Sequence, residues 1–216
     1  MSGHPLTRAE ERELGDLRDT LGAQLADSRQ RTGDAPPVLG LDLAAEASGY
    51  ALIPGPVGTI TAPKAKGKTR TLDDNLARLD VVEAAVAELL DVHRPRLVVL
   101  EDYAPGARGA SAHRLAEVSG TVRLACRRRA IPLVLAGVGQ IKQYATGKGT
   151  ATKVDMALAL YKRAGVEFAD DNQVDAWWAA ALGADHLGVP PVIMPAAHRA
   201  VLDRITWPVA GQDVTA

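Results

Sequence analysis

The amino-acid sequence predicts an α/β fold, in which a mixed central sheet is flanked by helices and preceded by a helical extension. Three observations lead to this prediction. Residues 38–53 form two apolar runs joined by small and polar residues, which is the pattern of a β-hairpin. Residues 97–100 are all apolar, as expected for a central strand that is covered on both faces. Segments with apolar residues at helical spacing follow these strands.

Composition narrows the class of protein. At 216 residues, with 47% hydrophobic and 24% charged residues, the chain is long enough for one catalytic-sized domain with a substantial core. The single Cys126 excludes an internal disulfide framework and a multi-cysteine zinc site, and its apolar surroundings predict a small core residue. No apolar run approaches the roughly 20 residues that span a bilayer, and the N-terminus lacks the apolar core of a signal peptide. We therefore expect a cytoplasmic protein with no membrane partner.

Three segments are expected along the chain. Residues 1–37 are predicted to form an amphipathic helix and a linker, residues 38–188 the main domain, and residues 189–216 a tail with a short helix. The first helix carries a leucine stripe, which is suited to docking either on the body or on a partner chain. Its members are Leu14, Leu17, Leu21 and Leu25.

The first half of the main domain has clear element boundaries. After the hairpin we expect a third strand near residues 59–61, and Thr71 is a typical N-cap for a helix that stops at Pro95. The predicted buried face of that helix consists of Leu72, Leu76, Leu79, Val82, Val86 and Leu89. The helix after the central strand covers about residues 111–130. Its predicted inner face consists of Leu115, Val118, Val122 and Cys126.

The second half continues the alternation of strands and helices. We expect a strand over residues 131–136, a helix over residues 153–164 and a short strand over residues 166–168. The predicted packing face of the helix consists of Val154, Leu158 and Tyr161. A last helix runs from about residue 172 to residue 186, and its alanines allow it to approach the sheet closely.

Carboxylates stand at the ends of apolar elements in three places. Asp42 lies in an apolar strand with no Lys or Arg between residues 38 and 63, and burial of an ionised carboxylate costs several kcal/mol unless it is compensated. It therefore either caps a turn facing solvent or binds a metal ion. Glu101 ends the central strand, and residues 170–175 place further acids at the start of a helix. Because catalytic groups of sheet proteins gather at strand ends and adjacent helix starts, these sites predict one acidic cluster.

The net charge of −1 conceals a strong segregation of charge. Residues 108–163 contain eleven Lys or Arg and two acids, and four more cations lie between residues 64 and 70. Residues 166–216 contain seven acids and only two arginines. A basic belt beside an acidic cluster is typical of a metal-dependent enzyme that acts on nucleic acid, because the belt can hold phosphates while the carboxylates hold ions.

The stretch from residue 140 to residue 153 lies inside this basic belt. Glycines flank Lys148, and threonine hydroxyls precede the next helix. This arrangement is suited to binding phosphate oxygens, although an ordinary surface loop has the same composition. The spacing of Gly, Lys and Thr excludes a Walker loop.

Taken together and in order, these motifs resemble the RuvC-type Holliday junction resolvases, and most closely the shorter proteins of that type carried by phages and prophages. The matching motifs are Leu39-Gly40-Leu41-Asp42 with Ser48-Gly49-Tyr50, Val99-Leu100-Glu101, Gln140 through Lys153, and Asn172-Gln173-Val174-Asp175-Ala176. The resemblance covers residues 38 to about 187. It implies a ribonuclease H-like fold, a homodimer, and cleavage of a four-way DNA junction with two Mg²⁺ or Mn²⁺ ions.

The resemblance also implies roles for individual residues. Asp42 would bridge both ions, Glu101 would bind one and Asp175 the other. The remaining metal ligand would be Asp171 or Asn172, since many members have Asp or His at the position of Asn172. Lys142 and Lys153 match positions that hold phosphates near the cleaved bond, and we count both among the catalytic residues. The DNA-binding set that we predict from this match and from the basic belt is Lys142, Lys148, Lys153, Tyr103, Arg114 and Arg123.

One departure from the family pattern concerns junction recognition. The family places an aromatic residue three positions after the second carboxylate, where this chain has Ala104 beside Tyr103. A ribonuclease H-like or generic branched-DNA nuclease is therefore the main alternative, followed by an inactive DNA-binding relative. Actin-like ATPases and sugar kinases also begin with an acidic hairpin, but they need a duplicated domain that a chain of this length without internal repeats does not provide.

Overall fold

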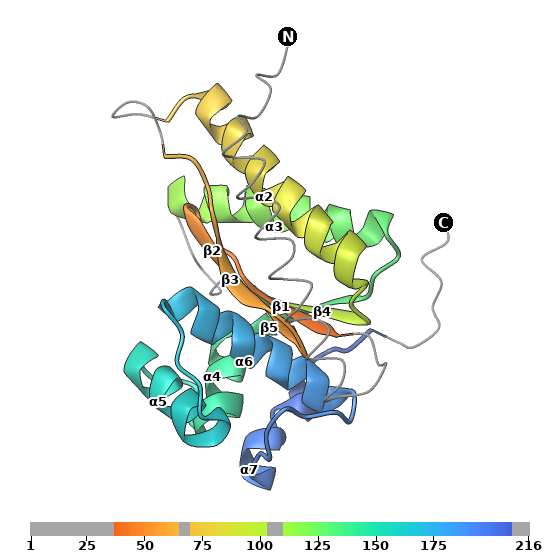
Figure 1. Ribbon diagram of the computed structural model, residues 1–216. Helices are drawn as coiled ribbons and strands as arrows, with labels where there is room; N and C mark the ends of the chain where they lie inside the picture. The colour runs from red at the N-terminus through yellow and green to blue at the C-terminus, as the bar shows by residue number, and fades with distance from the viewer. Residues whose placement is uncertain (1–36, 65–69, 103–109, 209–216) are drawn as a thin grey trace, which may run out of the picture.

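The computed structural model of the protein describes residues 37–64, 70–102 and 110–208, and it contains one five-stranded mixed sheet (Figure 1). The strands are β1 (Val38–Asp42), β2 (Ala47–Ile53), β3 (Val57–Thr61), β4 (Leu97–Asp102) and β5 (Leu133–Gly137). Their order across the sheet is β3-β2-β1-β4-β5. β1 pairs antiparallel with β2 and parallel with β4, so the hairpin and the central strand predicted from the sequence are both confirmed.

Helices cover both faces of the sheet (Figure 1). They are α2 (Leu72–His93), α3 (Ala110–Arg128), α4 (Val138–Thr146), α5 (Lys153–Ala164), α6 (Asp171–His186) and α7 (Ala196–Arg199), followed by the 3₁₀ turn η1 (Leu202–Arg204). α2 and α3 pack on one face, and α4, α5 and α6 lie on the other. This arrangement confirms the predicted α/β class with a mixed sheet flanked by helices.

β1 divides its side chains between the two halves of the core because successive residues of a strand point to opposite faces. Leu39 and Leu41 are buried against the α2 and α3 layer. Gly40 faces α6, where a Cβ atom would overlap the backbone of Ala176 and Ala180. The absence of a side chain at residue 40 therefore lets α6 lie directly on β1, as its alanines predicted.

The predicted inner face of α2 is only partly correct. Thr71 is the N-cap, with a complete capping box to Asp74, and Val82 and Val86 are buried. Leu72 and Leu76, however, are exposed, because the first turns of α2 project beyond the sheet (Figure 1). The predicted inner face of α3 holds, since Val118, Val122 and Cys126 are buried and Leu115 is partly buried.

Arg78 is buried between α2 and α3, which the leucine pattern did not indicate. Its guanidinium donates hydrogen bonds to Asn75 Oδ1 at 2.7 Å, to Glu117 Oε2 at 3.0 Å and to the Arg114 carbonyl at 3.2 Å. These acceptors offset the cost of placing a cation inside the protein. Arg78 thus joins the two helices of this layer.

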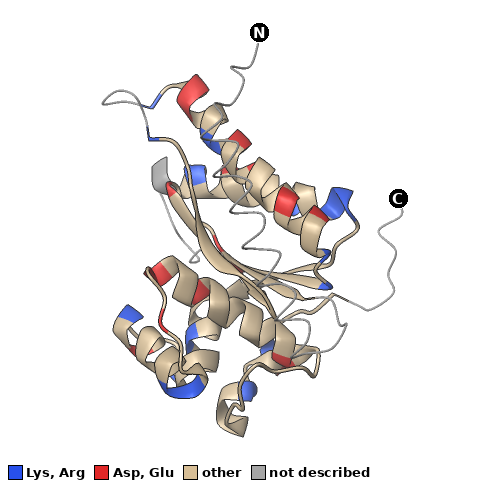
Figure 2. Cartoon of the chain, in the orientation of Figure 1, with Lys and Arg blue, Asp and Glu red and all other residues tan. Residues whose placement is uncertain are grey.

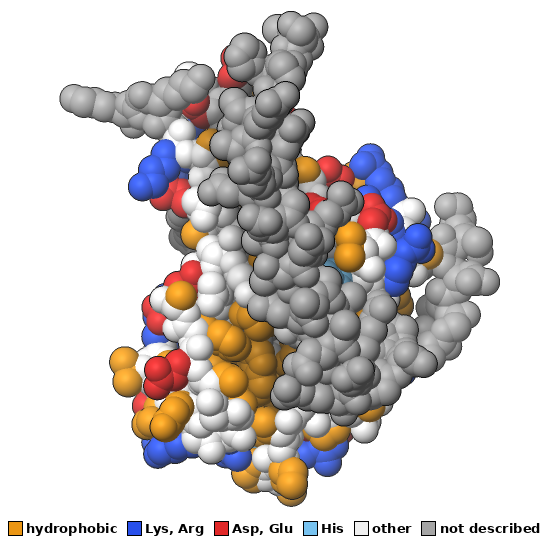
Figure 3. Space-filling view, viewed as in Figure 1, with side chains coloured by type: hydrophobic (Ala, Val, Ile, Leu, Met, Phe, Trp, Pro, Cys, Tyr) orange, Lys and Arg blue, Asp and Glu red, His pale blue; other side chains and the backbone are white. Residues whose placement is uncertain are grey.

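The predicted packing face of α5 is wrong, although its boundaries are right. Met156 and Leu160 are buried, whereas Val154, Leu158 and Tyr161 are 75%, 46% and 55% exposed. α5 has two apolar stripes. The Trp178 Nε1 group of α6 donates a hydrogen bond to the Met156 carbonyl at 3.2 Å, so the stripe that contains Met156 faces the core. The other stripe is exposed. Hydrophobic side chains are also visible on the surface of the lower part of the molecule in Figure 3.

Four further segments differ from the predictions. Residues 166–168 form no strand, because the sheet already ends at β5 and this segment crosses from α5 to α6. Residues 138–146, whose second half was taken as part of a phosphate-binding stretch, form α4. β3 and β5 are each displaced by one or two residues at one or both ends.

Some predictions fall outside the residues that the structure describes. They include the helix before residue 37 with its leucine stripe, the cations between residues 65 and 69, and Tyr103 and Ala104. Within residues 37–64, 70–102 and 110–208, no helix is long and apolar enough to cross a lipid bilayer.

Candidate active site

Two acidic residues stand side by side where β1 and β4 end. Leu41 pairs with Leu100 in the parallel register, so Asp42 and Glu101 are the next residues on adjacent strands. Both are partly buried. Because side chains alternate along a strand, both carboxylates project to the face that carries α6. The β1 and β4 register therefore brings together two of the predicted site residues.

α6 supplies the third carboxylate, and its first turn is fixed to the hairpin. Asp170 is the N-cap, accepting from Gln173 N at 2.9 Å and from Thr59 Oγ1 at 2.6 Å. Gln173 Nε2 donates to the same threonine oxygen at 2.9 Å, and Asn172 Nδ2 donates to the Ala47 carbonyl at 3.1 Å. These bonds tie the start of α6 to β2 and β3. Asp175 follows one turn later, over the sheet.

Electrostatic interactions show that the three carboxylates converge. Burial, followed by the charge of Asp175, raises the pKa of Asp42 to about 7. Burial, followed by the charges of Asp42 and Asp175, raises the pKa of Glu101 to about 8. Burial also raises the pKa of Asp175. The three carboxylates are therefore near enough to influence one another, and the protein compensates their charges incompletely.

Two lysines face this cluster from α4 and α5. The ammonium groups of Lys142 and Lys153 act on both Glu101 and Asp175, lowering the pKa of each and so opposing the effect of burial. Lys153 Nζ also lies 3.0 Å from Asp171 Oδ2 in an exposed ion pair. Acidic residues mark the first turns of α6, and basic residues lie on the helices beside it (Figure 2).

The chemistry of the donor set fits a hard divalent cation, since carboxylate and amide oxygens are the preferred ligands of Mg²⁺ and Mn²⁺. The described parts of the chain hold no group of three Asp, Glu, His or Cys side chains already gathered at metal-binding distance. The Asn172 side-chain amide donates a hydrogen bond to the Ala47 carbonyl, and the Asp171 carboxylate forms an ion pair with Lys153.

Comparison with known proteins agrees with this geometry. The family model described as "Crossover junction endodeoxyribonuclease RuvC" matches residues 38–182. The chain belongs to the RuvC family. The resemblance read from the sequence motifs is thus confirmed.

Two curated relatives carry the name crossover junction endodeoxyribonuclease RuvC. The protein of Saccharopolyspora erythraea is 32% identical over 157 residues, covering 72% of this chain and 78% of the relative. The protein of Rhodococcus opacus is 30% identical over 158 residues, covering 72% and 83%. The solved structure of T. thermophilus RuvC in complex with Holliday junction substrate matches with a TM-score of 0.56 and 20% identity, covering 73% of this chain and 99% of that one, and supports the common fold.

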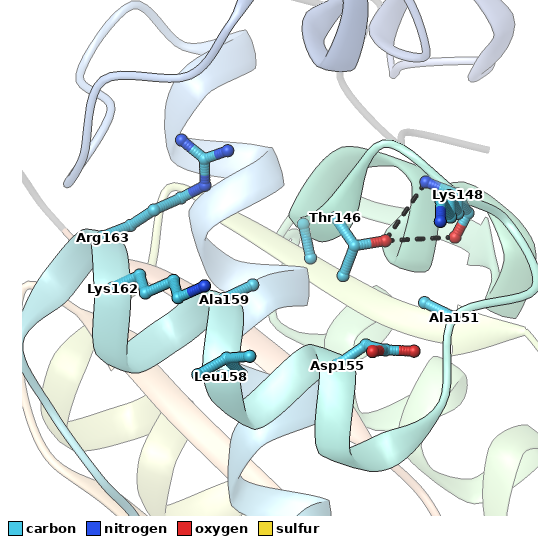
Figure 4. Close-up of a pocket in the computed structure, with 9 residues that line it drawn as sticks. Thr146, Lys148, Ala151, Asp155, Leu158, Ala159, Lys162 and Arg163 are labelled. Carbon is cyan, nitrogen blue, oxygen red and sulfur yellow. Dashed lines mark hydrogen bonds between the residues drawn. The ribbon is translucent and has the colours of Figure 1, made fainter.

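Within this RuvC fold, Lys148 lies on the loop between α4 and α5, beside a pocket of about 420 Å³ (Figure 4). Thr146 Oγ1 accepts from Lys148 N at 3.1 Å and donates to the Lys142 carbonyl at 2.8 Å, so the hydroxyl organises the loop. Lys162 and Arg163 line the same pocket.

The structure does not bring all the predicted DNA-binding residues together. Arg114 and Arg123 are on α3, which lies on the face of the sheet opposite α4, α5 and α6. Arg114 is the fifth residue of α3, whereas Arg123 is exposed more than two turns further along. Arg123 is therefore remote from the three carboxylates.

Sequence reasoning missed the contribution of Asp170 and Thr59. Asp170 fixes the start of α6 and also raises the pKa of Asp42 through its charge. The signal was present, because an Asp followed three residues later by Gln is a common pattern at a helix N-terminus. No sequence pattern indicated that Thr59 of β3 would be its partner, since the contact joins residues 111 positions apart.

Proposed function

We propose that this RuvC-family chain is a metal-dependent endodeoxyribonuclease that resolves four-way DNA junctions. One observation carries the proposal: Asp42, Glu101 and Asp175 converge from three elements, with Lys142 and Lys153 facing them. Family membership and the Holliday junction substrate bound to the T. thermophilus relative support the choice of substrate. The nearly neutral whole chain is compatible with DNA because Lys142 and Lys153 face the carboxylates and Lys148 lies on the loop between α4 and α5.

Two Mg²⁺ or Mn²⁺ ions are the proposed cofactors. Asp42 would contact both ions, Glu101 one and Asp175 the other, with Asn172 or Asp171 completing the set. When bound, a pair of such ions activates water and stabilises the leaving 3′ oxygen of a phosphodiester. The raised pKa values of Asp42 and Glu101 mean that both carboxyls must lose protons to become ligands, so cation binding should tighten as pH rises through about 7 to 8.

The lysines have a positioning and charge-neutralising role in this proposal. Lys142 and Lys153 would hold the phosphate next to the cleaved bond, with charge-assisted hydrogen bonds to its oxygens. Lys153 would exchange its exposed partner Asp171 for that phosphate. Lys148 would contact the backbone further along the strand.

We further propose a symmetric homodimer. A four-way junction needs two cuts related by its pseudo-two-fold axis, and one chain contributes one site. Isologous contacts would place two acidic clusters on the same side of the dimer. We assign the interface to α3 and its neighbour α2, where Leu72, Leu76 and Leu124 are exposed apolar residues. The leucine stripe of residues 1–34 is a second candidate for this contact.

A generic branched-DNA nuclease is the second candidate, because Ala104 replaces the aromatic residue that the family uses at the junction. A catalytically inactive relative is disfavoured, since all three principal carboxylates are present and the charges of Asp42 and Asp175 both act on Glu101. The two nuclease candidates share the same cleavage chemistry. They differ in substrate choice.

A substrate panel tests the proposal. Synthetic four-way junction, flap, linear duplex and RNA–DNA hybrid are incubated with Mg²⁺ and either the wild type, Asp42→Asn or the matched control Asp203→Asn, an exposed acid of the tail. We expect paired symmetric cuts in the four-way junction, less than a tenth of the wild-type rate for Asp42→Asn, and wild-type behaviour for the control. Equal rates on flap and junction would favour the generic nuclease.

A further inference from the structure

The C-terminal segment 195–205, which comprises α7 and η1, lies beyond the family match of residues 38–182 and yet is bonded to α4. His198 Nδ1 is 2.8 Å from the Tyr144 carbonyl. Gln140 Nε2 donates to the Arg204 carbonyl at 3.0 Å, and Arg204 NH2 donates to Gln143 Oε1 at 2.7 Å. Three residues of α4 are thus held by two residues of this segment.

Two of these contacts are made by side chains on one face of α4. Gln140 and Gln143 are related by i, i+3 spacing and share that face, whereas the third contact is to the backbone carbonyl of Tyr144. Lys142 points from the opposite face, where its charge acts on Glu101 and Asp175. α4 is therefore held between the C-terminal segment and the carboxylates.

α4 needs such support because it has only nine residues, and a helix of this length is marginal alone in water. The Gln140 side chain links its N-terminus to the segment, because the same amide accepts from Gly137 N at 2.8 Å and donates to Arg204. At the other end His198 binds a carbonyl of the last turn, where the helix offers no partner of its own. The His198 ring also packs against Gly147, the residue before Lys148.

The segment has its own anchors in the protein body, so it can serve as a fixed support. Val201 and Ile205 are buried in the core. The Arg199 guanidinium binds Asp185 at 2.9 to 3.0 Å, and that carboxylate, which is only 2% exposed, also accepts from the Tyr144 hydroxyl at 3.0 Å. The segment is therefore held by α6 and by the core independently of His198 and Arg204.

We propose that residues 195–205 form a positioning element of the nuclease site, which sets the place of Lys142 and of the Lys148 loop by holding α4 from behind. The proposal rests on the proposed function, in which Lys142 contacts the phosphate next to the cleaved bond. His198 and Arg204 are positioning residues in this scheme, because they act through α4 and touch neither the phosphate nor the carboxylates.

The test measures single-turnover cleavage of a synthetic four-way junction by the full-length protein with Mg²⁺. The variants are His198→Ala, Arg204→Ala and the combination of both, which leave Val201, Ile205 and Arg199 in place. Asp203→Asn is the control from the same segment, since it makes no hydrogen bond to α4 among the described residues. Amide hydrogen exchange of residues 141–149 is measured on the same proteins without DNA.

We expect the double variant to lose at least roughly tenfold in the cleavage step, because small displacements of a contacting group cost this much or more. Junction affinity and its salt dependence should stay within about twofold of the wild type, and α4 should exchange faster. His198→Asn should restore both rates, because the Asn side-chain amide can donate to the Tyr144 carbonyl. Arg204→Ala should add nothing in a Gln143→Ala background, since both changes break the same bond.

Two results would overturn the proposal. One is a folded double variant that cleaves at the wild-type rate. The other is a loss of rate accompanied by a weaker salt dependence and by an additive effect of Arg204→Ala and Gln143→Ala, which would make Arg204 a direct DNA contact. Hydrogen exchange separates this proposal from the proposed function, because it needs no cleavage. Unchanged exchange of α4 in the double variant refutes positioning, whereas a wild type that cuts no junction refutes only the nuclease assignment.

Discussion

Replacement of Asp42 by Asn should stabilise the cation-free protein at alkaline pH. The carboxyl of Asp42 has its pKa raised from 3.8 to about 7 by burial and by Asp175. Between pH 4 and 7 the unfolded chain loses this proton while the folded protein keeps it, so the free energy of unfolding of the wild type falls as pH rises. Asn is neutral at every pH. The free energy of unfolding of the variant therefore does not fall in this way as the pH rises.

The magnitude follows from the size of the shift. A change of about three pKa units corresponds to about 4 kcal/mol, and relaxation of the site lowers this figure, so we expect a gain of about 2 to 4 kcal/mol above pH 8 and almost none near pH 4. Urea unfolding followed by the fluorescence of the buried Trp177 and Trp178 measures it. The buffer should contain a chelator. Added Mg²⁺ should restore the stability of the wild type but not that of the variant.

Asp155→Asn is a control for which the expected change in stability at alkaline pH has the opposite sign. Hydrogen bonds from the Thr152 amide and hydroxyl lower the pKa of Asp155, so its contribution to stability is present above the unfolded-state pKa and is lost as pH falls. That variant should be less stable than the wild type at alkaline pH. If Asp42→Asn gains no stability above pH 8 without cations, the inference that Asp42 is an uncompensated buried carboxylate is wrong.

Three further predictions concern catalysis, DNA binding and packing. Glu101→Gln and Asp175→Asn should each reduce cleavage below a tenth of the wild-type rate while junction affinity in a gel-shift assay stays nearly constant; a variant that keeps more activity is not a catalytic ligand. Lys142→Ala and Lys153→Ala should each lower the slope of log affinity against log salt by roughly 0.9 on duplex DNA, and an unchanged slope in the double variant would place the DNA elsewhere. Gly40→Ala should lower the free energy of unfolding by about 3 kcal/mol or more, because its Cβ would meet the α6 backbone, and wild-type stability in urea would contradict the packing.

The candidate acidic residues could be chosen from the sequence because charged side chains are unusual within apolar strands. Asp42 and Glu101 interrupt apolar strands, and a carboxylate in such a place needs a compensating partner. The parallel register of those strands then makes the two residues neighbours. Motif order added Asp175, which is separated from Asp42 by most of the domain.

The packing faces of α2 and α5 were less predictable, because each helix has more apolar positions than its partner can cover. In α5 both stripes have helical spacing, and the choice between them depends on Trp178, a residue of another helix. In α2 the early leucines match the periodicity but lie past the edge of the sheet. Arg78 is the opposite case, a charged residue that is buried. Its burial depends on acceptors that Glu117 and Arg114 provide from α3. Local sequence carries no information about such distant partners.

The order of the elements along the chain has a consequence for synthesis. β1 and β4 carry the first two carboxylates and leave the ribosome early, whereas α6 brings Asp175 about 130 residues after β1. The face of β1 over Gly40 stays uncovered until α6 docks on it. A growing chain therefore holds an incomplete ligand set, and the support for α4 follows later still. If the proposed function and the proposed role of residues 195–205 hold, we expect full cleavage activity only after this last segment has been made and has packed against α4.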